Sequence, residues 1–144
     1  MNPTRGEKNF NVGNIERVPG TTWKGQSPDQ TADPRFVVFT SPVWGIRALA
    51  KVLLTYSRVY PQATPQDIDT VAEIIRRWAP NTENNTSAYI ASVCKSTGFG
   101  PDQPIDVTDP DTMAALVVAI CRHENGRLSY PVDVIEDGVQ RALA

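Results

Sequence analysis

The chain has 144 residues, 40% of them hydrophobic, with 14 Lys and Arg against 16 Asp and Glu, which gives a formal net charge of −2. This length and apolar content predict a single domain over residues 1–144 whose hydrophobic core needs no disulfide or structural metal to stabilise it. The absence of a basic excess argues against a nucleic-acid partner. No bilayer-length window is free of charge and the polar N-terminus lacks an apolar signal segment, so neither membrane insertion nor Sec export is expected.

Residues 1–41 are rich in Gly, Asn, Pro and Thr and show little helical periodicity. Residues 13–18 alternate apolar and polar side chains and end at the turn pair Pro19-Gly20, after which residues 21–24 fit a returning strand. Residues 35–39 are rich in strand-forming side chains and lie between prolines. We therefore expect a loop and β segment over residues 1–41, with a small antiparallel sheet of two or three strands.

Residues 42–144 predict a helical bundle, because apolar side chains recur at helical spacing between capping residues and breakers. Five helices are expected: from Ser41-Pro42 to near Tyr60, from Thr64-Pro65 to Trp78, from Asn85 or Thr86 to Gly98, from Asp109-Pro110 to Gly126, and from about Pro131 to Leu143. The fourth is apolar on most sides and should be the central, buried one. The expected fold class is mainly α (α+β).

The best candidate for chemistry is Glu124, at the end of the fourth helix in the run Arg122-His123-Glu124-Asn125-Gly126. A carboxylate in the last turn of a helix is unfavourable with the helix dipole, which prefers cations there. Partial burial and the dipole would both favour its protonated form, which suits a general acid in glycoside hydrolysis. The alternative is a surface carboxylate paired with a neighbouring cation.

Metal and cofactor chemistry find no support in the sequence. Cys94 and Cys121 lie within apolar helical patterns, and His123 is the single histidine, so no ligand spacing for zinc exists. No glycine-rich loop opens a helix in the way that phosphate binding needs. We therefore expect neither a metal nor another cofactor.

Several short motifs carry a family resemblance that covers nearly the whole chain. They are Gly-Asn-Ile at 13–15, Trp-Lys-Gly at 23–25, Phe-Val-Val-Phe-Thr-Ser-Pro at 36–42, Gly-Ile-Arg-Ala-Leu at 45–49, Trp-Ala-Pro at 78–80 and His-Glu-Asn-Gly at 123–126. With these the sequence resembles a group of phage virion-associated, lysozyme-like proteins. Val12 departs from that group, which more often has Pro in a Pro-Gly-Asn-Ile entry.

The order of these motifs is also similar to that of flagellar-type glucosaminidases and lytic transglycosylases. In those enzymes the helix that ends in the catalytic Glu comes first, whereas here it lies near the C-terminus. The resemblance thus implies a lysozyme-like fold whose chain order is circularly permuted, which a fold with neighbouring termini tolerates.

The resemblance also implies roles for particular residues. Glu124 would be the general acid, Tyr89 would stabilise the oxocarbenium-like transition state or orient the substrate, and Glu16 would be the second carboxylate, acting as a base. The implied substrate-binding residues are Asn14, Trp23, Asn125 and Tyr130. Four of them also have a plainer interpretation, since Tyr89 fits a core position, Glu16 a solvated strand, and Asn14 and Asn125 turns.

Three functions remain open from the sequence. The first is a glycosidase that cleaves bacterial peptidoglycan, of muramidase, lytic transglycosylase or glucosaminidase type. The second is a non-catalytic phage virion structural protein that keeps a lysozyme-like fold, and the third is an assembly adaptor without a glycan role. Bacterial peptidoglycan and other virion proteins are the expected partners. The expected location is the phage virion or the host cytoplasm until lysis, with action at the cell wall.

Overall fold

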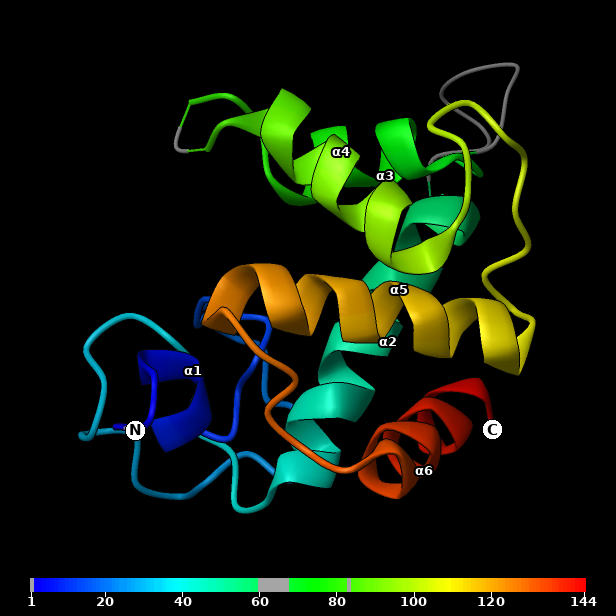
Figure 1. The fold of residues 1–144 in the computed structure, drawn as a ribbon. Coiled ribbons are helices and arrows are strands. Elements are labelled where there is room, and N and C mark those ends of the chain that lie inside the picture. The colour runs from blue at the N-terminus through cyan, green and yellow to red at the C-terminus, as the bar shows by residue number, and fades with distance from the viewer. Residues whose placement is uncertain (1, 60–67, 83) are drawn as a thin grey trace.

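The structure is a computed structural model that describes residues 2–59, 68–82 and 84–144. Over these ranges it contains six helices and no strand (Figure 1). The helices are α1 (Arg5–Lys8), α2 (Pro42–Val59), α3 (Val71–Trp78), α4 (Thr86–Thr97), α5 (Pro110–Asn125) and α6 (Val132–Leu143). The mainly helical part of the predicted fold class therefore agrees with the structure.

Helix α5 is the central element of the fold. It runs across the middle of the molecule, with α3 and α4 on one side, α6 on the other, and α2 crossing it (Figure 1). Seven of its residues are buried, and six of them lie in the apolar run between Met113 and Cys121 that predicts this burial. Burial of its flanks against α2, α4 and α6 fixes the direction in which its last turn points.

Two helices begin and end as their capping residues predict. Asn85 caps α4 by accepting a hydrogen bond from the backbone N–H of Ala88 at 3.1 Å, and Asp109 caps α5 in the same way through Thr112 at 2.9 Å. Gly98 and Gly126 end these helices in the left-handed conformation, at φ 81° and 76°. Such positions favour glycine, so the local signals were sufficient here.

The second predicted helix is shorter in the structure than its periodicity indicates. Its expected start at Thr64-Pro65 and the expected end of the preceding helix near Tyr60 lie outside the described residues. Helix α3 begins at Val71, where the side chain of Thr70 accepts a hydrogen bond from the Glu73 N–H at 3.2 Å. Ile68, which we expected on the helix face, precedes the cap.

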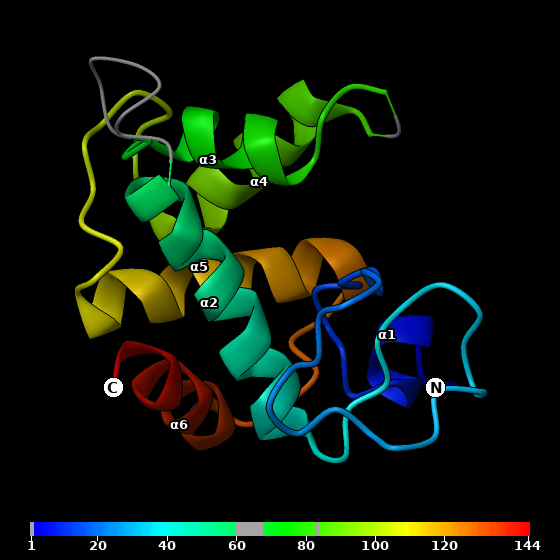
Figure 2. The ribbon, with the colours of Figure 1, turned by 180° about the vertical axis from the view of Figure 1, so that it is seen from behind.

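The predicted N-terminal antiparallel sheet is wrong. In the described part of residues 1–41 the chain forms the short helix α1 and loops, with two isolated antiparallel bridges, Glu16 to Phe36 and Gln26 to Phe39. The loops wrap around α1 and the start of α2 (Figure 2). The alternation of apolar and polar side chains is nevertheless real, since it places Ile15, Val37 and Phe39 in the core.

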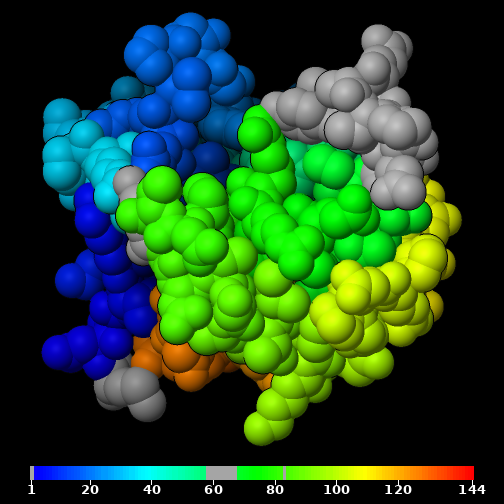
Figure 3. Space-filling model, turned by 90° about the horizontal axis from the view of Figure 1, so that it is seen from above, coloured from blue at the N-terminus to red at the C-terminus, as the bar shows by residue number. Residues whose placement is uncertain are grey.

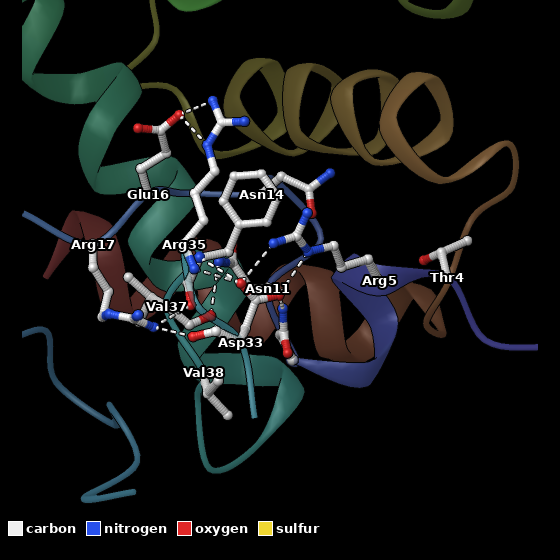
Figure 4. A network of polar contacts seen from close by, with 12 residues as sticks. Thr4, Arg5, Asn11, Asn14, Glu16, Arg17, Asp33, Arg35, Val37 and Val38 are labelled. Atoms are coloured by element: carbon white, nitrogen blue, oxygen red, sulfur yellow. Dashed lines mark hydrogen bonds and ion pairs between the residues drawn. The ribbon is translucent and has the colours of Figure 1, made fainter. Parts of the chain in front are cut away.

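Side-chain amides supplement the few backbone hydrogen bonds that join these extended segments. The amide of Asn11 donates to the carbonyl oxygens of Ile15 (3.0 Å) and Val37 (2.9 Å), and its oxygen accepts from the Ile15 N–H at 3.0 Å. Gln30 pairs in the same way with both backbone groups of Val38. These amides satisfy the buried backbone together with backbone bonds such as that from the Val37 N–H to the Ile15 carbonyl at 2.9 Å, so the extended segments form isolated bridges and no regular sheet. Figure 4 shows Asn11, Val37 and Val38 in this network.

A buried carboxylate holds the two ends of this segment together. Asp33 accepts hydrogen bonds from the Arg5 guanidinium at 2.7 and 2.8 Å and from the Asn9 amide at 2.9 Å, and it also accepts from the backbone N–H groups of Arg35 and Phe36 (Figure 4). The hydrogen bonds from Arg5 are the largest cause that holds the pKa of Asp33 well below its usual range. Asp33 thus stays charged and keeps α1 next to residues 33–36.

Candidate active site

Glu124 faces a cleft of about 440 Å³ between the N-terminal loops and the helical part of the molecule. Figure 3 views the face where these loops, in blue, meet the green α3–α4 region. The cleft is lined by Gly13, Asn14, Ile15, Glu16, Val18, Arg35, Phe36, Val52, Tyr56, Trp78, Ala79, Asn84 and Glu124. A mixed polar and aromatic lining of this kind is typical of small-molecule and glycan sites.

Both oxygens of the Glu124 carboxylate accept a hydrogen bond from a side chain of another element. Oε1 accepts from the Asn14 amide at 3.1 Å, and Oε2 accepts from the Tyr89 hydroxyl at 2.9 Å. The Tyr89 oxygen in turn accepts from the indole N–H of Trp78 at 3.1 Å. Three segments distant in sequence therefore converge on Glu124 at the end of α5.

Tyr89 is a permanently protonated donor at this site. The residue is 1% exposed, and the His123 ring stacks on its ring with centroids 3.6 Å apart. Burial, together with the charge of Glu124, raises the pKa of Tyr89 far above its usual value. The hydroxyl therefore keeps its proton over any working pH and can always donate to Glu124.

The backbone places Asn14 against Glu124 through an uncommon conformation. Asn14 has φ 50°, in the left-handed region, which asparagine tolerates better than most residues. The preceding turn is tied to α5 by Asn125, whose amide donates to the carbonyl oxygens of Val12 and Cys121, both at 2.9 Å. The Thr4 hydroxyl donates to the oxygen of the same amide at 2.6 Å.

A second tie joins α1 to the residues that follow Glu124. Arg127 forms an ion pair with Glu7, and its Nε lies 3.0 Å from Glu7 Oε2. Burial of Glu7 acts to raise its pKa, but hydrogen bonds from Arg127, Thr4 and Ser129 outweigh it and lower the pKa to about 2. The end of α5 is thus anchored to the N-terminal segment on both sides of Gly126.

Glu16, the predicted second carboxylate, lines the same cleft as Glu124. It is exposed and forms an ion pair with Arg35, whose Nε donates to Glu16 Oε1 at 2.8 Å. Arg35 also lies over one face of the Phe36 ring, 5.1 Å from its centroid, and Arg5 lies 4.3 Å from the same centroid. Glu16 is therefore held at the rim of the cleft by a cation.

Three of the predicted site residues line the cleft, namely Glu124, Asn14 and Glu16, and a fourth, Tyr89, is buried behind the lining and contacts Glu124. The other three predicted residues neither line the described part of the cleft nor hydrogen-bond to Glu124. Asn125 is 8% exposed and its amide is occupied by the contacts given above, and Trp23 packs against the core. Tyr130 is half-buried; burial raises its pKa to about 12, and its hydroxyl has no hydrogen-bond partner among the described residues.

Sequence reasoning missed the roles of Trp78, Tyr56 and Arg35. Trp78 fits the apolar face of its helix, a pattern that predicts core packing, yet it lines the cleft and hydrogen-bonds to Tyr89. The two residues are 11 positions apart with Pro80 between them, so no helical spacing relates them. No feature of the sequence other than the charge of Arg35 indicates that this residue lies at the site.

Within the ranges that the structure covers, no helix is long and apolar enough to cross a membrane. The same ranges hold no group of three or more His, Cys, Asp or Glu side chains that could bind a metal ion. Cys94 and Cys121 are both free thiols.

No family model matches the sequence. The chain is 36% identical over 138 residues to Protein P5 of Pseudoalteromonas phage PM2, and the alignment covers 94% of this chain and 80% of the phage protein. Identity of this extent over nearly the whole chain shows common ancestry. The protein therefore belongs to the family of this phage protein.

Proposed function

We propose that this protein is a glycosidase that cleaves the glycan of bacterial peptidoglycan with Glu124 as general acid. The observation that supports it best is the position of Glu124, a carboxylate in the last turn of a buried helix that faces a cleft and is held by Asn14 and Tyr89. A glycosidase needs a carboxylic acid fixed beside the scissile bond, and a residue in the last turn of a packed helix is held in such a fixed position.

The first chemical step follows from that position. Glu124 transfers its proton to the glycosidic oxygen while the bond from that oxygen to the sugar carbon breaks, and the electron pair of the bond stays on the oxygen. Positive charge develops on the sugar ring, as in other glycosidases. The carboxylate that remains accepts hydrogen bonds from Asn14 and Tyr89, which stabilise its new charge.

The second step depends on Glu16. As a base, Glu16 would activate a water molecule in an inverting reaction. Its ion pair with Arg35 engages the carboxylate that this role requires, so the geometry favours the other outcome. In that outcome one of the sugar's own hydroxyls attacks the ring carbon and gives its proton back to Glu124. The product is an anhydro sugar, as in lytic transglycosylases.

The cleft and an adjoining hollow are together large enough for a polymeric substrate. A second hollow of about 500 Å³ shares Glu16, Val18 and Arg35 with the cleft and continues it toward Pro19, Gln26 and Pro34. A strand of several sugars therefore has room on both sides of the Glu16–Arg35 pair.

A contact at the end of α5 matches part of the chain order of the resembled enzymes. In the resembled enzymes the chain passes from the Glu-bearing helix directly into the asparagine segment. Here Thr4, near the start of the chain, donates a hydrogen bond to Asn125, the residue after Glu124. A full circular permutation would also have to join the two chain ends, and these lie on opposite sides of the molecule, with α6 following Glu124 (Figure 1).

The test is release of soluble fragments from purified peptidoglycan. We expect the native protein to release them and Glu124→Gln to lose at least about 100-fold in rate, because the amide cannot donate the proton. The matched control is Glu136→Gln, an exposed glutamate on α6, which should keep the native rate. Equal rates for the native protein and Glu124→Gln would remove Glu124 from the mechanism.

A second function is supported by the comparison with Protein P5. That relative is a phage protein, and its name carries no catalytic meaning. We therefore also propose a phage virion protein that binds peptidoglycan through the same cleft without cleaving it. In this case the native protein and Glu124→Gln would sediment equally with peptidoglycan and neither would release fragments. In both cases the protein would reach the cell wall with the virion or at lysis.

A further inference from the structure

The hydrogen-bond chain that ends on Glu124 has a fixed direction. An indole N–H can only donate, so the Trp78 nitrogen must donate to the Tyr89 oxygen over their 3.1 Å contact. Tyr89 has a single hydroxyl proton, and the second contact of its oxygen is Glu124 Oε2 at 2.9 Å. With its oxygen accepting from Trp78, the hydroxyl proton points at Glu124.

We propose that Trp78 is a positioning residue that acts through Tyr89, so that the Tyr89 proton is always directed at Glu124. This proposal rests on the proposed glycosidase function and extends it to a residue outside the predicted site. Without the indole N–H, the Tyr89 hydroxyl can turn about its C–O bond. It then presents a lone pair to Glu124 in part of the population, which repels the carboxylate formed in the reaction.

The surroundings hold both partners in this geometry. The His123 ring stacks on Tyr89 and limits rotation of the phenol. The end of α3 is joined to the start of α4, because the Thr86 hydroxyl donates to the carbonyl oxygen of Ala79 at 2.5 Å and the Thr86 N–H donates to Asn81 at 3.2 Å. These contacts fix the spacing between Trp78 and Tyr89 across the turn.

The arrangement serves the charge change at Glu124. Its carboxylate gains negative charge only once the proton has left, so a donor fixed beforehand on Oε2 stabilises the transition state more than the ground state. A donor that must first reorient would stabilise the transition state less, because the free-energy cost of ordering the donor then adds to the activation barrier. Tyr89 supplies the donor, and Trp78 removes the alternative orientation.

Because Trp78 also lines the cleft, its two roles must be separated. The kinetic test compares Trp78→Phe, Tyr89→Phe and the double variant on purified peptidoglycan. Loss of a hydrogen bond to a charged group predicts a fall in kcat of about 10- to 100-fold for Tyr89→Phe. We expect a smaller fall for Trp78→Phe, of about 3- to 10-fold, and no further fall in kcat when it is added to Tyr89→Phe. If the two falls multiply, Trp78 acts through substrate contact alone and the proposal is overturned.

A second measurement does not depend on catalysis. In an NMR spectrum of the protein without substrate, Glu124→Gln should move the indole N–H resonance of Trp78, because a weaker acceptor at 124 weakens the hydrogen bond that Tyr89 accepts. In a Tyr89→Phe background the same change should leave that resonance in place. The indole of Trp23, outside the cleft lining, is the internal reference for an intact fold.

The two measurements distinguish the possible failures. A protein that releases no fragments but shows the coupled indole shift would lose the glycosidase function and keep the hydrogen-bond chain. An indole shift that is absent, or that is the same in both backgrounds, would overturn the role of Trp78 even in an active enzyme.

Discussion

Replacement of Asn11 tests whether side-chain amides take the place of a sheet in the N-terminal segment. Asn11 is 0% exposed, and its amide makes three hydrogen bonds to the backbone of Ile15 and Val37. In Asn11→Ala the Ile15 N–H and the Val37 carbonyl lose the partners described here, whereas the Ile15 carbonyl still accepts from the Val37 N–H at 2.9 Å.

The magnitude follows from these two orphaned groups. A buried backbone group left without a partner costs about 1–3 kcal/mol, so Asn11→Ala should lower the free energy of unfolding by roughly 4 kcal/mol. For a chain of 144 residues this corresponds to a fall in Tm of about 10–15 °C. Asn11→Asp should be at least as harmful, because it keeps the shape but turns a carboxylate oxygen toward two carbonyl oxygens.

Urea denaturation followed by circular dichroism measures both variants against Asn2→Ala, a change at an exposed asparagine. We expect the control to stay within about 0.5 kcal/mol of the native protein. A loss for Asn11→Ala no larger than that of the control would refute the account of this segment. A mild effect of Asn11→Asp would show that shape, and not hydrogen bonding, is what Asn11 supplies.

Two further predictions concern packing and acid stability. A Cβ at Gly45 would lie 1.9 Å from the carbonyl oxygen of Phe10. In thermal unfolding, Gly45→Ala should therefore lower the free energy of unfolding by about 3 kcal/mol. Gly100→Ala is the control and should be nearly neutral, because the nearest atom to its Cβ lies at 3.6 Å. The pKa of Glu7 is lowered from 4.5 to about 2 in the folded state, so its stabilisation is full above pH 4.5 and is lost as the pH falls toward 2. Tm measured across this range should therefore fall less steeply in Glu7→Gln than in the native protein, and equal slopes would contradict the tie between Glu7 and Arg127.

The helical part of the fold could be predicted because its signals are local. Asn85 and Asp109 are capping residues one position before their helices, and Gly98 and Gly126 end them at positive φ. Each signal acts within one turn of the chain, and short-range physical chemistry is sufficient to interpret it. The apolar run of α5 likewise predicts the central, buried helix.

The N-terminal segment could not be predicted in the same way. Alternating side chains show that a segment is extended and half-buried, but not what satisfies its backbone. Asn11 and Gln30 do so here, through contacts with residues up to 26 positions away. Nothing in the sequence distinguishes an asparagine that binds a buried backbone from one that makes a turn.

The site was predicted in part. The sequence singles out Glu124 because a carboxylate at a helix C-terminus interacts unfavourably with the helix dipole. Its neighbours come from 35 and 110 positions away, and only the resemblance to known enzymes suggested Tyr89 and Asn14. Trp78 was missed because its helical spacing fits the core equally well, and its bond to Tyr89 exists only once α3 and α4 are packed.

The most direct test of Glu124 as a glycosidic acid is mass spectrometry of peptidoglycan fragments after incubation with the native protein and with Glu124→Gln. The account predicts new glycan ends from the native protein, one water lighter than hydrolytic ends, and none from the variant. Native protein that leaves every glycosidic bond intact, or a variant that produces the same ends at the same rate, would contradict it.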